Sequence, residues 1–119
     1  MSTSTPAATP LSDSEFQQLS HAVLARIETT VDRWLEDDVI DIDAQRTGGL
    51  LQLSFPNGSK IVINTQPPLH ELWLASKAAG QHFRHVDGRW LDTRDGSEFF
   101  AVLSAQISAQ GGQALQLSA

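Results

Sequence analysis

Cysteine is absent from the 119-residue chain. Without thiolates, the chain cannot hold a cysteine-ligated zinc or iron–sulfur site, and it offers no cysteine nucleophile. No apolar run approaches the roughly 20 residues that a membrane-spanning helix needs. The first ten residues contain no arginine or lysine, so they do not resemble a secretory signal or a transit peptide. The length fits one domain, which we expect to be soluble and cytoplasmic.

Basic residues are scarce in one stretch, residues 28–43. This stretch holds seven of the 14 acidic residues and one basic residue, Arg33, so it carries the whole net charge of −6. A surface of this charge would repel phosphates, which argues against nucleic-acid binding. A cation or a basic protein surface is the expected partner. The seven acidic residues are Glu28, Asp32, Glu36, Asp37, Asp38, Asp41 and Asp43.

The placement of these acids is unfavourable for local stability. Glu28, Asp32 and Glu36 share one helical stripe, where like charges four residues apart cost about 0.2–0.5 kcal/mol per pair. The helix dipole also disfavours anions at a helix C-terminus. Carboxylates are suitable ligands for Ca²⁺, Mg²⁺, Mn²⁺ and iron, and exposed carboxylates that do not converge would bind weakly at several sites. The alternative is a solvated acidic face that only aids solubility.

Motifs of several other chemistries are missing. The acidic stretch lacks both the Asp-x-Asp-x-Asp-Gly order and the closing Glu of an EF-hand. We find no nucleophile elbow and no glycine-rich phosphate loop. His82 and His85 are three residues apart, so they should face opposite sides of a strand and not share a metal. We therefore predict that the protein is not an enzyme.

The beginning of the domain has a clear helix signal. Ser12 and Glu15 form a capping box, with Ser12 as N-cap. Apolar residues follow at spacings of three and four, which predicts a helix of roughly 20 residues with one buried stripe. The stripe comprises Phe16, Leu19, Val23, Ile27, Val31 and Trp34 or Leu35.

Alternating patterns after residue 38 predict strands at 39–44, 50–55, 59–64, 69–75, 81–86 and 89–92. Turns are expected at 47–49, 56–58 and 87–88, and interruptions at 67–68 and Gly80. A second helix is predicted at about 98–109, capped by Asp95 or Ser97 and ended by Gly111 and Gly112. Its expected inner face is Phe99, Val102, Leu103, Gln106 and Ile107.

This order predicts an α+β, two-layer sandwich, in which two helices pack on one face of an antiparallel meander of five or six strands. Residues 1–11 are expected to be a flexible lead-in, 12–110 the domain and 111–119 a tail. The tail contains Leu115 and Leu117, and it either lies back across the domain or is loose.

Trp73 alternates with Leu72 and Leu74, so it should lie on the outer sheet face. There, with Asn64 and Gln66 nearby, it is a candidate contact for a protein partner. The alternative is that Trp73 packs flat over its own cross-strand neighbours. Trp90 could face either the core or the same outer surface.

One segment, residues 57–77, combines an Asn-Gly-Ser-Lys hairpin with the run Pro-Leu-His-x-x-Trp-Leu-Ala. It is followed by Gly-Gln-His-Phe at 80–83, by Trp90, and by Asp-Gly-Ser-Glu-Phe-Phe at 95–100. Over about residues 12–110 the chain resembles the frataxin family, in particular its bacterial, CyaY-type members. The fold of that family agrees with the order of elements predicted above.

The resemblance implies that the seven acids of residues 28–43 form a ridge that binds iron weakly as Fe²⁺ or Fe³⁺. It also implies that this ridge docks on a cysteine desulfurase, and that Trp73, Asn64 and Gln66 contact the assembly of desulfurase and iron–sulfur scaffold protein. Thr29, Thr30 and Arg33 depart from the acids that relatives often hold, and the stretch 34–48 is slightly longer than in some relatives.

The leading expectation is therefore an iron-binding accessory protein that regulates iron–sulfur cluster assembly, with no nucleic-acid or membrane partner. Since bacterial members tend to slow the process, we expect an inhibitory effect on sulfur transfer. A ferroxidase that stores iron is the alternative, although the sequence lacks the Glu-x-x-His pairs of a di-iron bundle. A plain interaction module, whose acids serve only solubility, is a third possibility.

Overall fold

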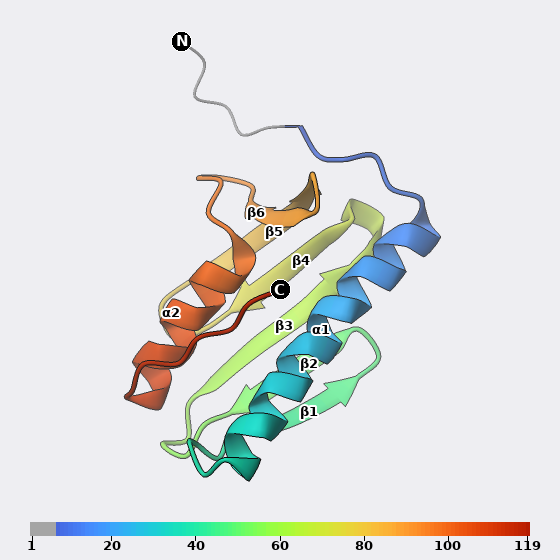
Figure 1. Cartoon of the computed structure of the whole chain (residues 1–119). Coiled ribbons are helices and arrows are strands. Elements are labelled where there is room, and N and C mark those ends of the chain that lie inside the picture. Colours follow the sequence, from blue (N-terminus) through green and yellow to red (C-terminus); the bar gives the residue numbers. More distant parts are fainter. Residues whose placement is uncertain (1–6) are drawn as a thin grey trace.

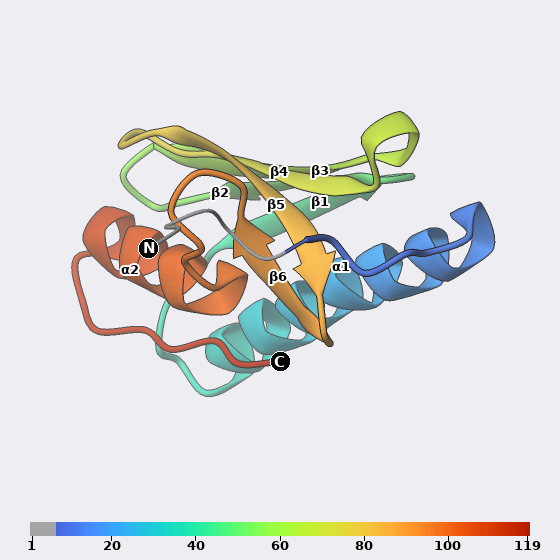
Figure 2. The same ribbon diagram turned by 90° about the horizontal axis from the view of Figure 1, so that it is seen from above.

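Two helices cover one face of a six-stranded antiparallel sheet (Figures 1 and 2). The structure is a computed structural model that describes residues 7–119, so residues 1–6 of the expected lead-in lie outside the described part. The strands follow one another in sequence order, which confirms the predicted meander and sandwich. The elements are α1 (Asp13–Glu36), β1 (Asp43–Thr47), β2 (Leu50–Ser54), β3 (Lys60–Gln66), the 3₁₀ turn η1 (Pro67–Leu69), β4 (Glu71–Ala75), β5 (Gly80–Val86), β6 (Arg89–Asp92) and α2 (Phe99–Gly111).

The capping box at the start of α1 is confirmed. The Ser12 hydroxyl accepts a hydrogen bond from the Glu15 backbone N–H, and the Glu15 carboxylate accepts one from the Ser12 N–H, both at 3.0 Å. The bond from the Ser12 backbone lowers the pKa of Glu15 below its ordinary value. The helix begins where the local sequence places it because these two bonds satisfy N–H groups that no preceding turn can pair.

The buried stripe of α1 differs from the prediction at one residue. Leu19 was expected in the core but is 36% exposed, whereas Leu24 is fully buried. With 3.6 residues per turn, the face centred on the sheet takes Ser20, Leu24 and Ile27. Leu19 lies at the edge of that face, where the sheet no longer covers it.

The inner face of the sheet meets the helices in one apolar core. The alternation predicted for β2, β3 and β4 is confirmed, because every second side chain is 0–1% exposed. Each such side chain contributes about 1.5–3 kcal/mol through burial. The inner-face residues of the central strands are Leu51, Leu53, Ile61, Ile63, Leu72, Leu74 and Phe83.

The first strand begins later than the predicted 39–44. Residues 40–42 are unpaired, although Ile42 is buried between the exposed Asp41 and Asp43 as the alternation indicated. Asp43 pairs with Ser54, the last residue of β2. Beyond that point the chain of β2 turns away through residues 55–59, so residues 39–42 have no strand to pair with.

Two further local predictions, the interruption at Gly80 and the cap of the second helix, were wrong, and the position of Trp90 is now settled. Gly80 does not interrupt the sheet but starts β5, opposite Ala75. Glu98, not Asp95 or Ser97, caps α2, because its carboxylate accepts from the N–H groups of Phe100 and Ala101 at 2.7 and 3.0 Å. Trp90 faces the core and is 5% exposed.

The carboxylate of Asp95 instead shapes the loop before α2. It accepts a hydrogen bond from the Ser97 N–H at 2.9 Å, and this bond lowers the pKa of Asp95.

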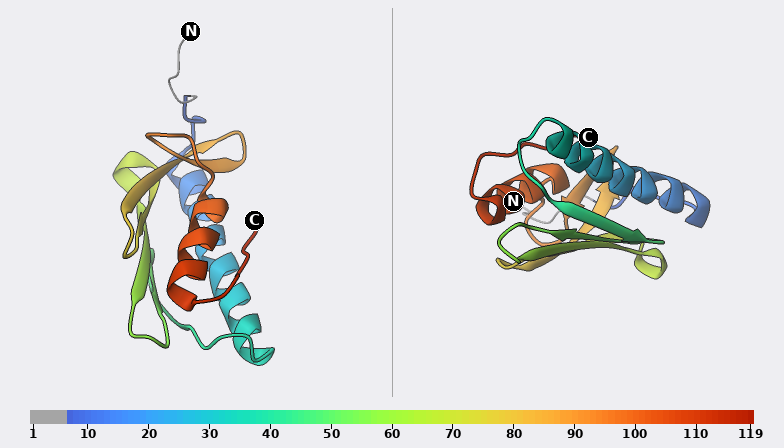
Figure 3. Two further views of the ribbon diagram at one scale, coloured as in Figure 1. Left: turned by 90° about the vertical axis from the view of Figure 1, so that its left-hand side faces the viewer. Right: turned by 90° about the horizontal axis from the view of Figure 1, so that it is seen from below.

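The C-terminal tail lies back across the domain, between the two helices (Figure 3). Ser104 and Ser108, one turn apart on α2, accept hydrogen bonds from the N–H groups of Leu117 and Leu115, both at 2.9 Å. The side chains of these leucines are 1% and 5% exposed. The tail is therefore part of the core, which settles the open alternative.

Part of the expected lead-in also contacts the domain. The Thr9 N–H donates to the His85 carbonyl, and the Thr9 hydroxyl accepts from the Asp87 N–H, both at 2.8 Å. Leu11 packs against the core cluster.

We predict that Leu117→Ala lowers the free energy of unfolding by about 2–4 kcal/mol, because it leaves a cavity under the tail. Urea denaturation followed by circular dichroism measures this. The matched control is Gln116→Ala at the exposed neighbouring position, which should change stability by less than about 0.5 kcal/mol. Equal stability of the two variants would show that the tail does not pack as described.

Candidate functional site

The last turn of α1 and the start of β1 lie at the same end of the molecule (Figure 1). Six of the seven acids of residues 28–43 are exposed, and Glu28 is half-buried. The six exposed acids are distributed from the second half of the helix, through its C-cap, to the first residue of β1, and the exposed Arg33 lies among them. We call them the acidic surface: Asp32, Glu36, Asp37, Asp38, Asp41 and Asp43.

Glu28 does not join this surface because Arg46 binds it. The Arg46 guanidinium lies 2.9 Å from the Glu28 carboxylate. The side chain of Arg46 is 25% exposed and that of Glu28 is 32% exposed. The same guanidinium donates to Nδ1 of His21 at 2.9 Å and, through Nε, to the Gly48 carbonyl at 3.2 Å. The charge of Glu28 is therefore neutralised inside the protein.

The helix ends in an arrangement that would normally use glycine. The Val39 N–H bonds the Trp34 carbonyl at 2.8 Å and the Asp38 N–H bonds the Leu35 carbonyl at 3.1 Å, which is the pattern of a Schellman cap. The residue between, Asp38, has φ +57°. Glycine adopts this left-handed conformation without penalty, whereas a side chain is strained there. An acid thus stands where local stability favours glycine.

The acidic surface is open and has few internal partners. Among residues 7–119, no three His, Cys, Asp or Glu side chains converge as a metal site would require. Within the same residues, no ion pair involves a member of the acidic surface. Asp43 accepts a hydrogen bond from the side-chain amide of Gln45 at 3.2 Å. Such carboxylates can attract cations collectively, with water completing each coordination shell, but they form no closed cage.

A second candidate surface lies on the outer face of the sheet. Asn64, Trp73 and His82 are directly paired across β3, β4 and β5. The rings of Trp73 and His82 stack with centroids 4.1 Å apart and an angle of 6°. Both alternatives for Trp73 therefore hold: it is on the outer face, half-buried, and it packs flat on its cross-strand neighbour.

Glu71 fixes this aromatic pair. Its carboxylate accepts a hydrogen bond from the Trp73 indole at 2.9 Å and lies 3.8 Å from Nδ1 of His82. Gln66 donates to Asn64 at 3.2 Å, which extends the same patch. We call Asn64, Gln66, Glu71, Trp73 and His82 the outer patch. Sequence reasoning missed Glu71 and His82, although the alternation of β4 and β5 with Leu72 and Phe83 inward could have placed them there.

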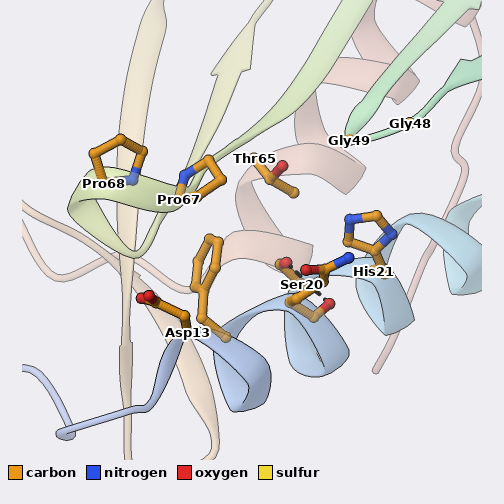
Figure 4. Close-up of a pocket in the computed structure, with 10 residues that line it drawn as sticks. Asp13, Ser20, His21, Gly48, Gly49, Thr65, Pro67 and Pro68 are labelled. Atoms are coloured by element: carbon orange, nitrogen blue, oxygen red, sulfur yellow. Dashed lines mark hydrogen bonds between the residues drawn. The ribbon is translucent and has the colours of Figure 1, made fainter.

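A pocket of about 570 Å³ opens elsewhere, near the N-terminal half of α1. Figure 4 shows that Asp13, Ser20 and His21 from α1 face Thr65 and the two prolines of η1 across it. None of the residues that line it belongs to the acidic surface or to the outer patch, although Thr65 lies on β3 between Asn64 and Gln66. The pocket is therefore separate from both candidate surfaces.

Comparison with known proteins decides the family. Residues 9–113 match the model of the frataxin-like domain. The chain belongs to the frataxin family. A Paraburkholderia phymatum relative, "Iron-sulfur cluster assembly protein CyaY", is 47% identical over 108 residues, which cover 91% of this chain and 99% of the relative. A Burkholderia mallei relative of the same name is 48% identical over 109 residues, covering 92% and 100%.

Solved frataxins share the fold. The structure of frataxin from Psychromonas ingrahamii is 38% identical, with a TM-score of 0.80, and covers 92% of this chain and 100% of that one. A trimeric frataxin from the yeast Saccharomyces cerevisiae, complexed with ferrous iron, is 22% identical with a TM-score of 0.67, covering 92% and 94%. At that identity the yeast structure supports the frataxin fold alone. No helix within residues 7–119 is long and apolar enough to cross a membrane.

The cap of α1 in this frataxin yields a test. We predict that Asp38→Gly raises the free energy of unfolding by about 0.5–1 kcal/mol relative to Asp38→Asn, because only glycine relieves the left-handed strain. Both substitutions remove the same charge, so urea denaturation of the pair isolates the conformational part. A glycine variant that is less stable than the asparagine variant would contradict the geometry.

Proposed function

We propose that this frataxin is an iron-binding accessory protein of iron–sulfur cluster assembly, and that it slows sulfur transfer in an iron-dependent way. The observation that carries the proposal is the acidic surface: six exposed carboxylates that form no ion pair within residues 7–119, at a helix end where charge repulsion and the helix dipole both oppose them. The names of the curated relatives support the pathway.

Iron is the proposed cargo of the acidic surface. Carboxylate oxygens are suitable ligands for iron, and the names of the curated relatives, iron–sulfur cluster assembly proteins, support the choice of metal. Because the six carboxylates do not converge, binding should be weak, spread over several positions, and reversible. Glu28 should contribute little, since Arg46 already neutralises it.

The same surface is proposed to dock on the cysteine desulfurase. A concentrated negative field attracts a basic surface and speeds encounter, but it does not by itself fix orientation. The outer patch would supply that orientation, because the stacked and hydrogen-bonded Trp73 is a rigid aromatic anchor. We infer that the outer patch contacts the desulfurase together with the scaffold protein.

A ferroxidase function has no specific support. A di-iron oxidation centre places several carboxylates and histidines around two metals inside a helical bundle. Among the described residues, no three such side chains converge. We therefore retain the accessory role, which requires no catalytic centre in this chain.

The proposal is tested in a cluster-assembly assay containing the cysteine desulfurase, the scaffold protein, cysteine and Fe²⁺. Wild-type protein should lower the initial rate of cluster formation, and more strongly as Fe²⁺ increases. The variant Asp37→Asn/Asp38→Asn/Asp41→Asn/Asp43→Asn should need about ten-fold more protein for the same effect, because most of the attractive field is lost.

Two double variants with the same change in net charge separate the effect of charge on the acidic surface from the effect of the protein's net charge. Asp41→Asn/Asp43→Asn should weaken the effect, whereas Asp13→Asn/Asp87→Asn, with the same change in net charge away from the surface, should act like wild type. Trp73→Ala should weaken docking while cation binding is unchanged. An absence of any rate effect at every Fe²⁺ concentration would refute the proposed function.

A further inference from the structure

Glu71 on β4 and His82 on β5 are diagonal neighbours on the outer face of the sheet, and both helices lie on the opposite side (Figure 3). The Oε1 atom of Glu71 lies 3.8 Å from Nδ1 of His82, which is too long for a hydrogen bond. The side chain of His82 is 49% exposed and that of Glu71 is 19% exposed. The gap between the two atoms is therefore accessible and is wide enough for an ion that bonds to both.

The other three histidines are less suited to bind an ion. A ring nitrogen of His21 and one of His70 each lie 2.8–2.9 Å from a charged side chain, which leaves no room for an ion between the two groups. His85 is 8% exposed, and its Nδ1 is buried. Among the four histidines of the chain, His82 thus has the arrangement that best fits a metal ligand.

Neighbouring groups fix both side chains. The His82 ring stacks on the Trp73 indole with centroids 4.1 Å apart, and the His82 carbonyl accepts a hydrogen bond from the Thr93 N–H at 2.9 Å. The indole N–H donates to Oε1 of Glu71 at 2.9 Å. A carboxylate oxygen has two lone pairs, so this bond orients the carboxylate and leaves one lone pair for an ion. Hydrogen bonds that orient a ligand in this way are typical of metal sites.

The two donor atoms determine which ions fit. Imidazole nitrogen suits late divalent transition metals such as Zn²⁺ and Cu²⁺, whereas sites built from oxygen alone suit Mg²⁺, Ca²⁺ and Mn²⁺. Zinc binds both donor types at about 2.0–2.2 Å, so tetrahedral coordination places the two atoms about 3.4 Å apart. A small rotation of the exposed His82 side chain closes the remaining gap. The acidic surface, which contains carboxylates only, selects for different ions.

We propose that Glu71 and His82 bind one late divalent transition-metal ion of the Zn²⁺ and Cu²⁺ class, through Oε1 and Nδ1. His82 binds in its neutral form, with its proton on Nε2. Within residues 7–119 no three His, Cys, Asp or Glu side chains converge, so water completes the coordination shell. Arg84, the cross-strand partner of Glu71, adds a positive charge beside the site. Binding is therefore weak and reversible.

The experiment is a titration of ¹⁵N-labelled protein with Zn²⁺, followed by NMR of the His82 ring nitrogens and the Trp73 indole N–H. Excess Mg²⁺ occupies the carboxylate-only positions of the acidic surface. In wild-type protein, both sets of signals should shift together and saturate as one site. The mixture contains no desulfurase and no scaffold protein, so the outcome is independent of the proposed function.

Three variants test the two ligands and the hydrogen bond that orients one of them. His82→Gln and Glu71→Gln should each bind Zn²⁺ at least about ten-fold more weakly, because each leaves a single ligand. Trp73→Phe retains an aromatic ring but removes the indole donor, so its affinity should also fall about ten-fold. The Trp73 indole signal reports on the first two variants, and the His82 ring signals report on the third.

Matched controls remove an imidazole or a carboxylate outside the outer patch. His70→Gln and Asp87→Asn should leave the Zn²⁺ affinity of the outer patch unchanged, and circular dichroism establishes that every variant is folded. The proposal is overturned if the His82 and Trp73 signals do not shift up to about 1 mM Zn²⁺, where only very weak binding remains. Wild-type affinity in Glu71→Gln, or an equal loss of affinity in His70→Gln, would also overturn it.

Discussion

Burial of the apolar stripe of α1 against the inner face of the sheet is the interaction on which the acidic surface depends. The charged end of the helix is unfavourable by itself: carboxylates repel one another, the dipole opposes them, and Asp38 is held in a left-handed conformation. Phe16, Leu24 and Ile27 are almost fully buried further back along the same helix. Their burial, worth about 1.5–3 kcal/mol for each large side chain, offsets these costs and holds the surface in position.

The C-terminal tail and Arg46 also help to hold α1 in position. The tail closes the gap between the helices through Leu115 and Leu117, and the paired serines of α2 satisfy its backbone. Arg46, from β1, ties α1 to the sheet through Glu28 and His21. This ion pair removes one carboxylate from the candidate cation surface and uses it for cohesion. Within residues 7–119 the remaining six acids form no ion pair, while the helix and the strand that carry them are fixed by the core.

Local signals allowed most elements to be predicted from the sequence. The capping box of Ser12 and Glu15, the alternation in β2 to β4 and the Asp87-Gly88 turn each depend on neighbours a few residues apart, and each is confirmed. The frataxin resemblance, also predicted, is confirmed by the family match. The predicted start of the first strand was wrong because strand pairing, which depends on a distant part of the chain, determines it. β1 begins only at Asp43, since its partner β2 ends at Ser54.

In the candidate site, too, features set by neighbouring residues were predictable, and features set by distant residues were not. Charge density and helical spacing were sufficient to predict one continuous group of acids. The loss of Glu28 from that group was not predictable, because Arg46 lies 18 residues away and reaches it only across the fold. Glu71 and His82 likewise join Trp73 through strand pairing. The assignment of iron and of a desulfurase partner remains a prediction that rests on the resemblance and on the names of relatives.

The central claim is that the six acids form one open, weak and shared cation surface. Titration of ¹⁵N-labelled protein with Mn²⁺, which broadens nearby NMR signals, tests it most directly. The account predicts graded broadening over residues 32–43, in fast exchange, with Glu28 and the outer patch affected least. A single tight site in slow exchange, or broadening centred on the pocket around His21, would contradict it.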